Sequence, residues 1–337
     1  MTAELLDRRL LVVTGKGGVG KSTVAAAIAV AAARRGRRVV VAEVGRRGDV
    51  AAMLDPAHGD VPGDASDADD GFDERPIPGP WGDRLWHVSV SPEAALREYL
   101  RDQLPIGPLA DVLRSSRVFG ALTAATPGMR ELLAMGKVWE LSRPQRRTPG
   151  AEPYDLCVMD APASGHAVTI LGAPGQFAAT ARVGPVARQG QWIDATIRHP
   201  AETAVVIAAT AEELPVGEAL ELQDALEAAG VTIGLGVVDG LLTDRFDAGD
   251  RERLATAGDD PALRAARDHA ARAHDQQRQL ARLRRELRAP VATLPQLPVR
   301  RVGPEEVGRL ADRFEAVLRR AAGAAERGRP DGAGGRG

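Results

Sequence analysis

The stretch RLLVVTGKGGVGKSTVAAAIAVAAARRGRRVVVAEV, residues 9–44, decides the fold of this chain. Its apolar first part, residues 9–14, predicts a buried strand that stops at a cluster of glycines. The Ala-rich segment 21–35 predicts a helix, and Gly36 stands where a helix C-terminus favours glycine. Residues 38–44 predict a second strand. Together they make a βαβ unit, which implies a parallel sheet with a right-handed crossover.

Nine residues inside this unit match the phosphate-loop pattern of glycine, four residues, glycine, lysine and serine or threonine. They are Gly15, Lys16, Gly17, Gly18, Val19, Gly20, Lys21, Ser22 and Thr23. The glycines let successive backbone N–H groups point at phosphate oxygens, and the following helix adds its positive end. We expect Lys21 to reach the β- and γ-phosphates and Ser22 to bind Mg²⁺. The alternative is a glycine-rich turn that binds nothing, but the position between a strand and a helix favours the phosphate loop.

A second candidate site follows the predicted strand 154–160, which ends in Asp160. In phosphate-loop enzymes an acid at such a strand end orients Mg²⁺, usually through water, and the next loop can respond to the γ-phosphate. Residues 161–166, Ala-Pro-Ala-Ser-Gly-His, form that loop here. The alternative role of Asp160 is to cap the next helix. His166 fits a switch role and a purely structural role equally well.

The remaining pattern extends the same fold as one phosphate-loop domain over residues 1–320. Further strands are predicted at 84–90, 203–209, 231–238 and 290–294, and helices at 215–229 and 304–322. This alternation predicts an α/β protein with a mostly parallel twisted sheet and helices on both faces. The domain includes an acidic loop (56–80), a helical insertion (92–147) and a charged helical segment (247–288), and a disordered tail is expected at 321–337.

Composition excludes several classes of function. The net charge is −2 and aromatic residues make up 3% of 337 residues, so no nucleic-acid partner is expected. A single cysteine, Cys157, leaves no intrachain disulfide and no multi-cysteine metal site. The N-terminus lacks the apolar core of a signal peptide, and no apolar run reaches bilayer length. We therefore expect a cytoplasmic protein whose membrane contact is at most peripheral.

Lysine use singles out the phosphate loop again. The chain has three lysines, Lys16, Lys21 and Lys137, and its other basic residues are all arginine. Two of the three lysines lie in the phosphate loop. A chain that uses arginine almost everywhere keeps lysine where a planar guanidinium would not serve.

Both motifs resemble those of one family. The phosphate loop resembles the deviant Walker A loop of the MinD, ParA, nitrogenase-iron-protein and ArsA ATPases, and residues 160–166 resemble the Asp-Thr-Ala-Pro-Thr-Gly-His loop of the ArsA-like members. The resemblance implies ATP and Mg²⁺ as cofactors and a dimer in which Lys16 reaches the partner's nucleotide. It also implies that Asp160 holds the Mg²⁺-bound water and that 161–166 form the second switch.

The chain departs from this family at the first switch, where the family has an Asp that activates the attacking water. The aligned position is Gly45 or Val44, and Glu43 and Asp49 are the nearest carboxylates. The string Asp-Pro-Ala-His at 55–58 matches the family's tetrapeptide in letters but lies about ten residues too late, so we interpret it as coincidence. Hydrolysis is therefore the part of the function that the sequence supports least.

The base-binding positions differ as well. The family usually has an Asn that reads adenine where this chain has Asp239, and a carboxylate can accept from the adenine amino group but cannot donate to N7. We still expect ATP rather than GTP. Pro295 and Leu297 lie in a segment that resembles the loop over the base, or alternatively forms only a Pro-rich turn. The cysteines that some members use for zinc or arsenite are missing, so neither chemistry is expected.

These features predict a dimeric ATP-hydrolysing switch, either a homodimer or a heterodimer with a paralogue, that acts on a protein partner or client. One alternative is a nucleotide-binding regulatory subunit with little hydrolysis, paired with an active paralogue. A metabolic kinase with the same loop is a third reading. The helical insertion corresponds to a subdomain that forms a client groove in some members, although its apolar residues are expected mainly in the core. The helix 304–322 is expected to pack on the sheet rather than on a membrane.

Overall fold

The structure is a computed structural model, and it describes residues 5–45, 48–56, 72–103, 128–148, 150–181, 184–258 and 260–327. An eight-stranded sheet forms its centre, in the order β3-β4-β2-β5-β1-β6-β7-β8. The strands are β1 (Leu10–Thr14), β2 (Val39–Val44), β3 (Arg75–Pro76), β4 (Leu85–Val90), β5 (Leu156–Asp160), β6 (Thr203–Ala209), β7 (Ile233–Leu241) and β8 (Val291–Pro295). All neighbouring pairs are parallel except β3 with β4. The predicted fold class, a mostly parallel α/β sheet, is confirmed.

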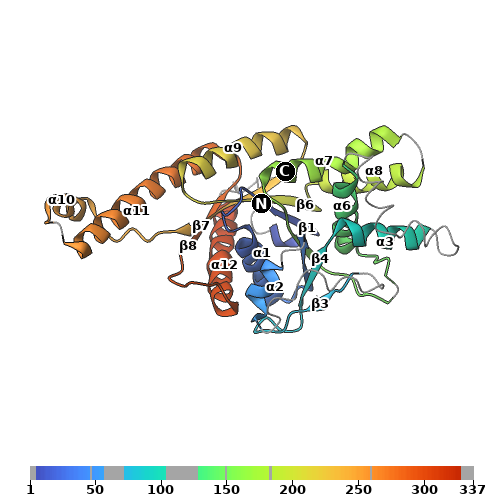
Figure 1. Cartoon of the computed structure of the whole chain (residues 1–337), viewed down its shortest axis with the longest axis horizontal. Helices are drawn as coiled ribbons and strands as arrows, with labels where there is room; N and C mark the ends of the chain where they lie inside the picture. Colours follow the sequence, from blue (N-terminus) through green and yellow to red (C-terminus); the bar gives the residue numbers. More distant parts are fainter. Residues whose placement is uncertain are drawn as a thin grey trace, which may run out of the picture.

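Helices cover both faces of the sheet (Figure 1). One face carries α1 (Lys21–Arg34), α2 (Asp49–Leu54) and α12 (Pro304–Arg327). The other carries α6 (Met129–Ser142), α7 (Ser164–Ala181), α8 (Pro185–Arg198), α9 (Glu213–Ala228) and α11 (Pro261–Glu286). Helix α3 (Pro92–Gln103) packs on α6, α10 (Ala248–Thr256) packs on α11, and a short 3-10 helix (Leu5–Asp7) precedes β1.

The central strand shows why both faces are covered. Every residue of β1 is buried, and successive side chains of a strand point to opposite faces. Leu11 and Val13 join the core beneath α1 and α12, whereas Leu10 and Val12 join the core beneath α6 to α9. A strand that is buried on both faces requires a helical layer on each side of the sheet, as in parallel α/β proteins.

The sheet register collects the candidate site at one edge. Strand β5 lies between β2 and β1, and Asp160 is in register with Glu43 on one side and Val13 on the other. The phosphate loop leaves β1 directly after Thr14. The two motifs are therefore neighbours at the carboxyl ends of the strands, which is where parallel α/β sheets bind ligands.

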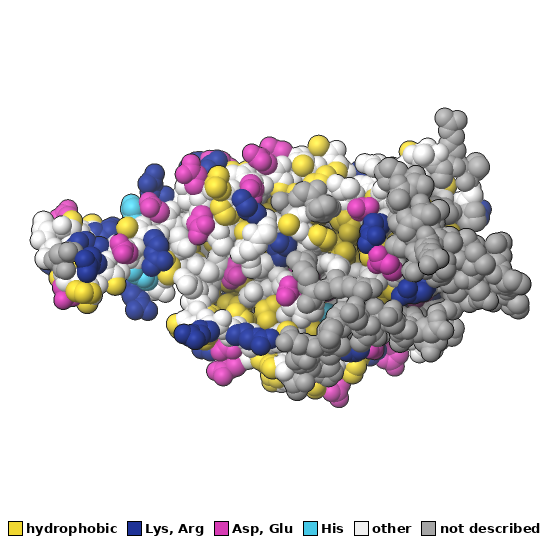
Figure 2. Space-filling model, in the orientation of Figure 1, with side chains coloured by type: hydrophobic (Ala, Val, Ile, Leu, Met, Phe, Trp, Pro, Cys, Tyr) yellow, Lys and Arg dark blue, Asp and Glu magenta, His cyan; other side chains and the backbone are white. Residues whose placement is uncertain are grey.

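A helical arm extends beyond the β8 side of the sheet, with α11 as its shaft and α10 at its far end (Figure 1). In α11 the buried residues are small or aliphatic: Ala270, Ala273, Leu280 and Leu283. Figure 2 shows acidic and basic side chains mixed over the surface of this arm. The charged helical segment of the sequence is thus a solvated pair of helices.

Three details differ from the sequence predictions. Helix α12 continues to Arg327, so the first part of the expected disordered tail is helical; the rest lies outside the described residues. The segment between β5 and β6, for which we predicted no helix bounds, forms α7 and α8. The expected acidic loop contains the short edge strand β3, while its residues 57–71 lie outside the described part of the chain.

Candidate functional site

Two glycines of the phosphate loop are required by close contacts. Gly15 has φ 152°, and a Cβ atom there would lie 2.1 Å from the Ala208 carbonyl oxygen. Gly20 has φ 84°, and its Cβ would lie 2.0 Å from Oδ2 of Asp239. No side chain fits at these separations, and a positive φ disfavours any residue but glycine. The loop therefore curls tightly at the N-terminus of α1, beside the ends of β6 and β7.

The loop's second lysine is held inside the loop. Lys21 is buried, and its Nζ atom donates a hydrogen bond to the Lys16 carbonyl oxygen at 2.8 Å. Val19 is buried beneath the loop, and Thr23 lies with its hydroxyl 3.9 Å from the sulfur of Met53 on α2. The predicted phosphate-contacting ammonium thus lies within the concave loop, where a point charge suits phosphate oxygens.

The structure brings Ser22 and Asp160 together. The Ser22 hydroxyl donates to Oδ2 of Asp160 at 2.6 Å, and the Asp160 side chain is fully buried at the end of β5. A hydroxyl and a carboxylate side by side next to a phosphate cradle are the hard oxygen ligands that Mg²⁺ prefers, directly or through water. These two residues fit the implied metal. The side chain of His166 lies outside the described residues.

Lys16 forms an ion pair within its own chain. Its Nζ atom lies 2.5 Å from Oε1 of Glu218 on α9, and the two side chains are 40% and 35% exposed. The lysine therefore stands at the rim of the loop, half open to solvent. Sequence reasoning did not predict Glu218 as a partner of Lys16. The sequence offered one weak sign of it, an acidic residue in the first turns of the helix that follows β6.

Glu43 is fully engaged in structural contacts. Its Oε1 accepts the N–H of Asp49 at 2.8 Å, and its Oε2 accepts the N–H of Val50 at 3.2 Å. Oε2 also lies 2.7 Å from Nε2 of His87 on β4. With 2% of its side chain exposed, this carboxylate caps the N-terminus of α2 rather than facing a water molecule. His87, which sequence reasoning also missed, is a polar residue within a mostly buried strand.

Asp49, unlike Glu43, is accessible to solvent. It is exposed in the first turn of α2, directly after the first-switch segment. Asp55 follows the last turn of α2, and its neighbours Ala57 and His58 lie outside the described residues. Of the two carboxylates predicted near the first switch, Asp49 is the exposed one, and its side chain has no buried hydrogen-bond partner among the described residues.

The predicted base-binding residues do not share one hollow. Burial raises the pKa of Asp239 to about 6, although the hydrogen bond from the Gly240 N–H acts in the opposite direction. The carboxylate of Asp239 lies against Gly20. Pro295 pairs with Leu241 at the end of β7, so the two segments are neighbours in the sheet. However, Pro295 and Leu297 line a hollow of about 270 Å³ whose other walls are residues of α12: Arg309, Leu310, Asp312 and Arg313.

Fold and loop define a P-loop nucleotide-binding ATPase. Residues 8–184, more than half of the chain, match the family described as anion-transporting ATPase, and the chain belongs to this ArsA ATPase family. It is 30% identical over 241 residues to the ATPase BagA of Mycobacterium tuberculosis, a match that covers 68% of this chain and 64% of that protein. The ATPase ARSA1 of Chlamydomonas reinhardtii is 29% identical over 50% of this chain and 22% of its own length. The ATPase GET3B of Arabidopsis thaliana is 26% identical, over 50% of this chain and 40% of its own length.

These matches cover between 50% and 68% of this chain, and less than two thirds of each of the relatives just named. The family match over residues 8–184 includes the phosphate loop and Asp160. Within the described ranges, none of the helices has both the length and the apolar character that crossing a bilayer requires.

Proposed function

We propose that this chain is an ATP-hydrolysing molecular switch that works in the cytoplasm as a dimer and couples its nucleotide state to a protein partner. The observation that carries the proposal is the contact between Ser22 and Asp160 beside a complete phosphate loop. It supports nucleotide and metal binding by residues of one chain, and family membership supports ATP as the nucleotide.

The roles follow from the positions of the side chains. The backbone of residues 15–20 and the start of α1 bind the phosphates, and Lys21 neutralises the β- and γ-phosphate charge. Ser22 and Asp160 would hold Mg²⁺, which supplies charge neutralisation to the phosphate oxygens when bound. Asp160 begins the segment that leads into α7, so a change at the γ-phosphate can move α7 and the helices packed on it.

Lys16 provides the dimeric part of the proposal. Its half-exposed ammonium at the rim is placed where a second chain could approach, and its present partner Glu218 is a partly buried group whose ion pair with it is of modest strength. Exchange of this cis pair for the phosphates of a partner chain would link nucleotide binding to assembly. The partner is a second copy of this chain or a paralogue.

A second candidate function is a nucleotide-binding regulatory subunit with little turnover of its own. The engagement of Glu43 favours it, because one of the two carboxylates near the first switch is bound to the α2 backbone and to His87. In this alternative an active paralogue completes the site. The presence of Asp49 in the first turn of α2 favours the active switch.

The test is steady-state ATP hydrolysis by the purified chain, titrated with Mg²⁺. We expect turnover that Lys21→Ala and Lys16→Ala reduce at least tenfold, and Asp160→Asn should raise the Mg²⁺ concentration needed for half-maximal rate. Arg253→Ala, an exposed residue of α10, serves as a control. Tight ATP binding with no turnover in the wild type would contradict the active switch and favour the regulatory subunit. Absence of ATP binding would contradict both.

A further inference from the structure

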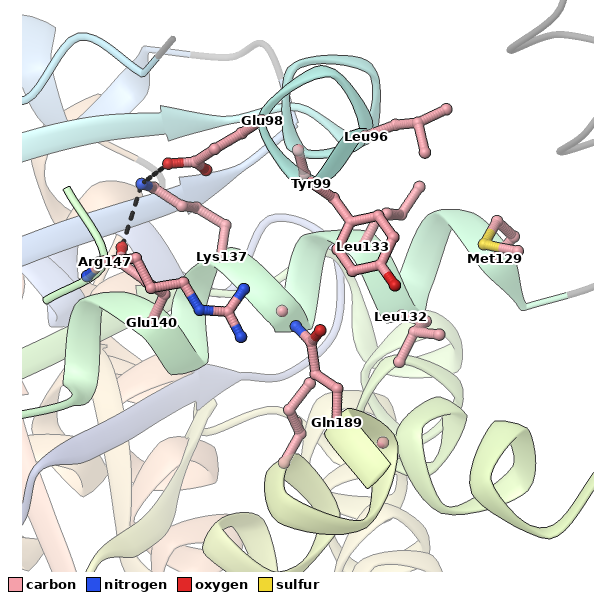
Figure 3. A pocket seen from close by; sticks show the side chains of 14 residues that line it. Leu96, Glu98, Tyr99, Met129, Leu132, Leu133, Lys137, Glu140, Arg147 and Gln189 are labelled. Carbon is pink, nitrogen blue, oxygen red and sulfur yellow. Dashed lines mark hydrogen bonds and ion pairs between the residues drawn. The ribbon is translucent and has the colours of Figure 1, made fainter. Parts of the chain in front are cut away.

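A separate cavity of about 210 Å³ lies among α3, α6 and α8 (Figure 3), and no phosphate-loop residue lines it. Its walls are mainly apolar and include Ala95, Leu96, Met129, Leu132, Leu133 and Ile193. Gly136 on α6 leaves space toward Gln189 of α8, and Gly190 of α8 also lines the cavity, with its own Cβ position facing α7. The cavity is concave, largely apolar and bordered by a few polar groups, which is the usual form of a small-molecule site.

Most of the charged groups at its edge already have partners. Lys137 has 2% of its side chain exposed, and its Nζ atom lies 2.9 Å from Glu98 and 3.1 Å from Glu140. Glu140 also accepts the Nε–H of Arg146 at 2.7 Å. Both cavity-lining carboxylates are therefore paired with cations, and a second cation would find no free carboxylate among them.

Among the described residues that line the cavity, three further hydrogen-bond donors are Arg147, Tyr99 and Gln189. In the described part of the chain, no carboxylate lies within ion-pair distance of the Arg147 guanidinium, whose described neighbour is the Trp139 ring at 5.6 Å. Burial raises the pKa of Tyr99 while the positive charge of Arg147 lowers it, so the phenol is a neutral donor close to that charge. In Figure 3, Arg147 and Gln189 extend into the same space from different elements, with the Tyr99 ring on another side.

An apolar wall facing a cation and two neutral donors suits an anion with an apolar tail. A guanidinium binds a carboxylate or a phosphate through two parallel hydrogen bonds, and one guanidinium matches the single charge of a carboxylate. An engineered cavity of about 150 Å³ holds benzene, so by proportion this one holds about eight non-hydrogen atoms. One turn of an α-helix, about 10 Å wide and 5.4 Å high, is too large.

We propose that this cavity is a binding site for a free short-chain monocarboxylate of the size of hexanoate. Its carboxylate would lie on Arg147, Tyr99 and Gln189, and its tail would lie against Leu132, Leu133 and Ile193. The site does not depend on ATP hydrolysis, and its occupancy can be measured whether or not the chain turns over nucleotide.

Gly136 offers a matched pair of variants. A Cβ added there would meet only Nε2 of Gln189, at an ordinary 3.7 Å, so the position faces the cavity. Gly136→Leu fills the space, whereas Gly136→Ala occupies little of it. Both replace a helical glycine by a better helix former, so neither is expected to prevent folding. Arg147→Gln, at an exposed residue, removes the charge and keeps donors.

The experiment is isothermal titration calorimetry of the full chain with hexanoate, 1-hexanol and hexylamine at neutral pH. We expect hexanoate to bind at least tenfold more tightly than 1-hexanol, and hexylamine not to bind. Gly136→Leu should weaken hexanoate binding at least tenfold and Gly136→Ala less than threefold. Arg147→Gln should bring the two affinities to within threefold of each other, with 1-hexanol little changed.

Several outcomes would overturn the proposal. They are absence of saturable hexanoate binding, equal affinities for hexanoate and 1-hexanol in the wild type, and undiminished binding by a Gly136→Leu variant whose circular dichroism matches the wild type. Loss of ATP binding with hexanoate binding retained would contradict the proposed function alone, which keeps the two proposals distinguishable.

Discussion

The Nζ atom of Lys16 and Oε1 of Glu218 lie 2.5 Å apart, although 202 residues separate them in the sequence. The contact joins the rim of the phosphate loop to α9 within one chain. If Lys16 serves a partner's nucleotide, this pair must open first. The strength of the cis pair then becomes part of the energetics of dimer formation.

Glu218→Gln should therefore strengthen the ATP-dependent dimer. Each half-exposed pair is worth up to about 1 kcal/mol and a homodimer opens two of them, so the dimer dissociation constant should fall by up to about thirtyfold. Sedimentation velocity with a non-hydrolysable ATP analogue and Mg²⁺ measures this constant. Glu221→Gln, an exposed residue on the same helix, is the matched control. A weaker dimer in Glu218→Gln would show that Glu218 supports assembly instead.

The two carboxylates near the first switch should separate in their effects. Glu43→Ala removes the acceptor for two α2 backbone N–H groups and the partner of His87, so it should cost about 2–4 kcal/mol of unfolding free energy. Asp49→Asn should lower kcat at least tenfold and leave stability within about 0.5 kcal/mol, because the residue is exposed. Urea unfolding and ATP turnover measure the two effects. Full activity of Asp49→Asn would exclude it as the activating base.

The Asp239 carboxyl should make stability depend on pH. Its pKa is raised from 3.8 to about 6, so the folded chain holds this proton more tightly than the unfolded chain. Unfolding free energy should therefore fall as pH rises through this window and remain lower above it. The shift corresponds to at most about 3 kcal/mol. Asp239→Asn removes this penalty, so its stability relative to the wild type should rise between pH 4 and pH 7.

Urea unfolding of both proteins at several pH values measures this difference. If the difference in unfolding free energy between Asp239→Asn and the wild type is constant from pH 4 to pH 7, Asp239 is equally ionised in the folded and unfolded chains. Unfolding of an Asp73→Asn variant, at an exposed carboxylate, controls for the removal of an acid.

Lys137 should be important for stability rather than for catalysis. It lies with Glu98 and Glu140 in a nearly dry environment. Lys137→Ala leaves Glu98 without its ammonium partner and Glu140 with Arg146 alone, so it should cost about 3 kcal/mol. Arg130→Ala breaks the exposed pair with Glu93 and should cost less than about 1 kcal/mol. Urea unfolding measures the free energy of unfolding of both variants. Equal losses would show that the burial of Lys137 does not make its ion pairs more important than the Arg130–Glu93 pair.

Much of the fold could be predicted because its signals are local. The strand β6 was predicted at its observed bounds, 203–209, and most other core strands within a few residues, because continuous apolar runs mark buried parallel strands. The bounds of helices α7 and α8 were not predicted. Pro174 and several glycines interrupt their sequence, and the helices are stabilised by packing on each other rather than by local preference.

The sequence by itself determined the phosphate loop, since nine consecutive residues contain the glycines, the lysine and the hydroxyl that the chemistry needs. It also pointed to Asp160, because the end of a parallel strand has a known place in the sheet. Only the tertiary structure decided the partners of Lys16 and Glu43, the position of Asp239 against Gly20, and the cavity beneath Arg147. A loop's curvature depends on neighbouring backbone torsions, whereas these contacts depend on strand register and helix packing between segments far apart in the chain.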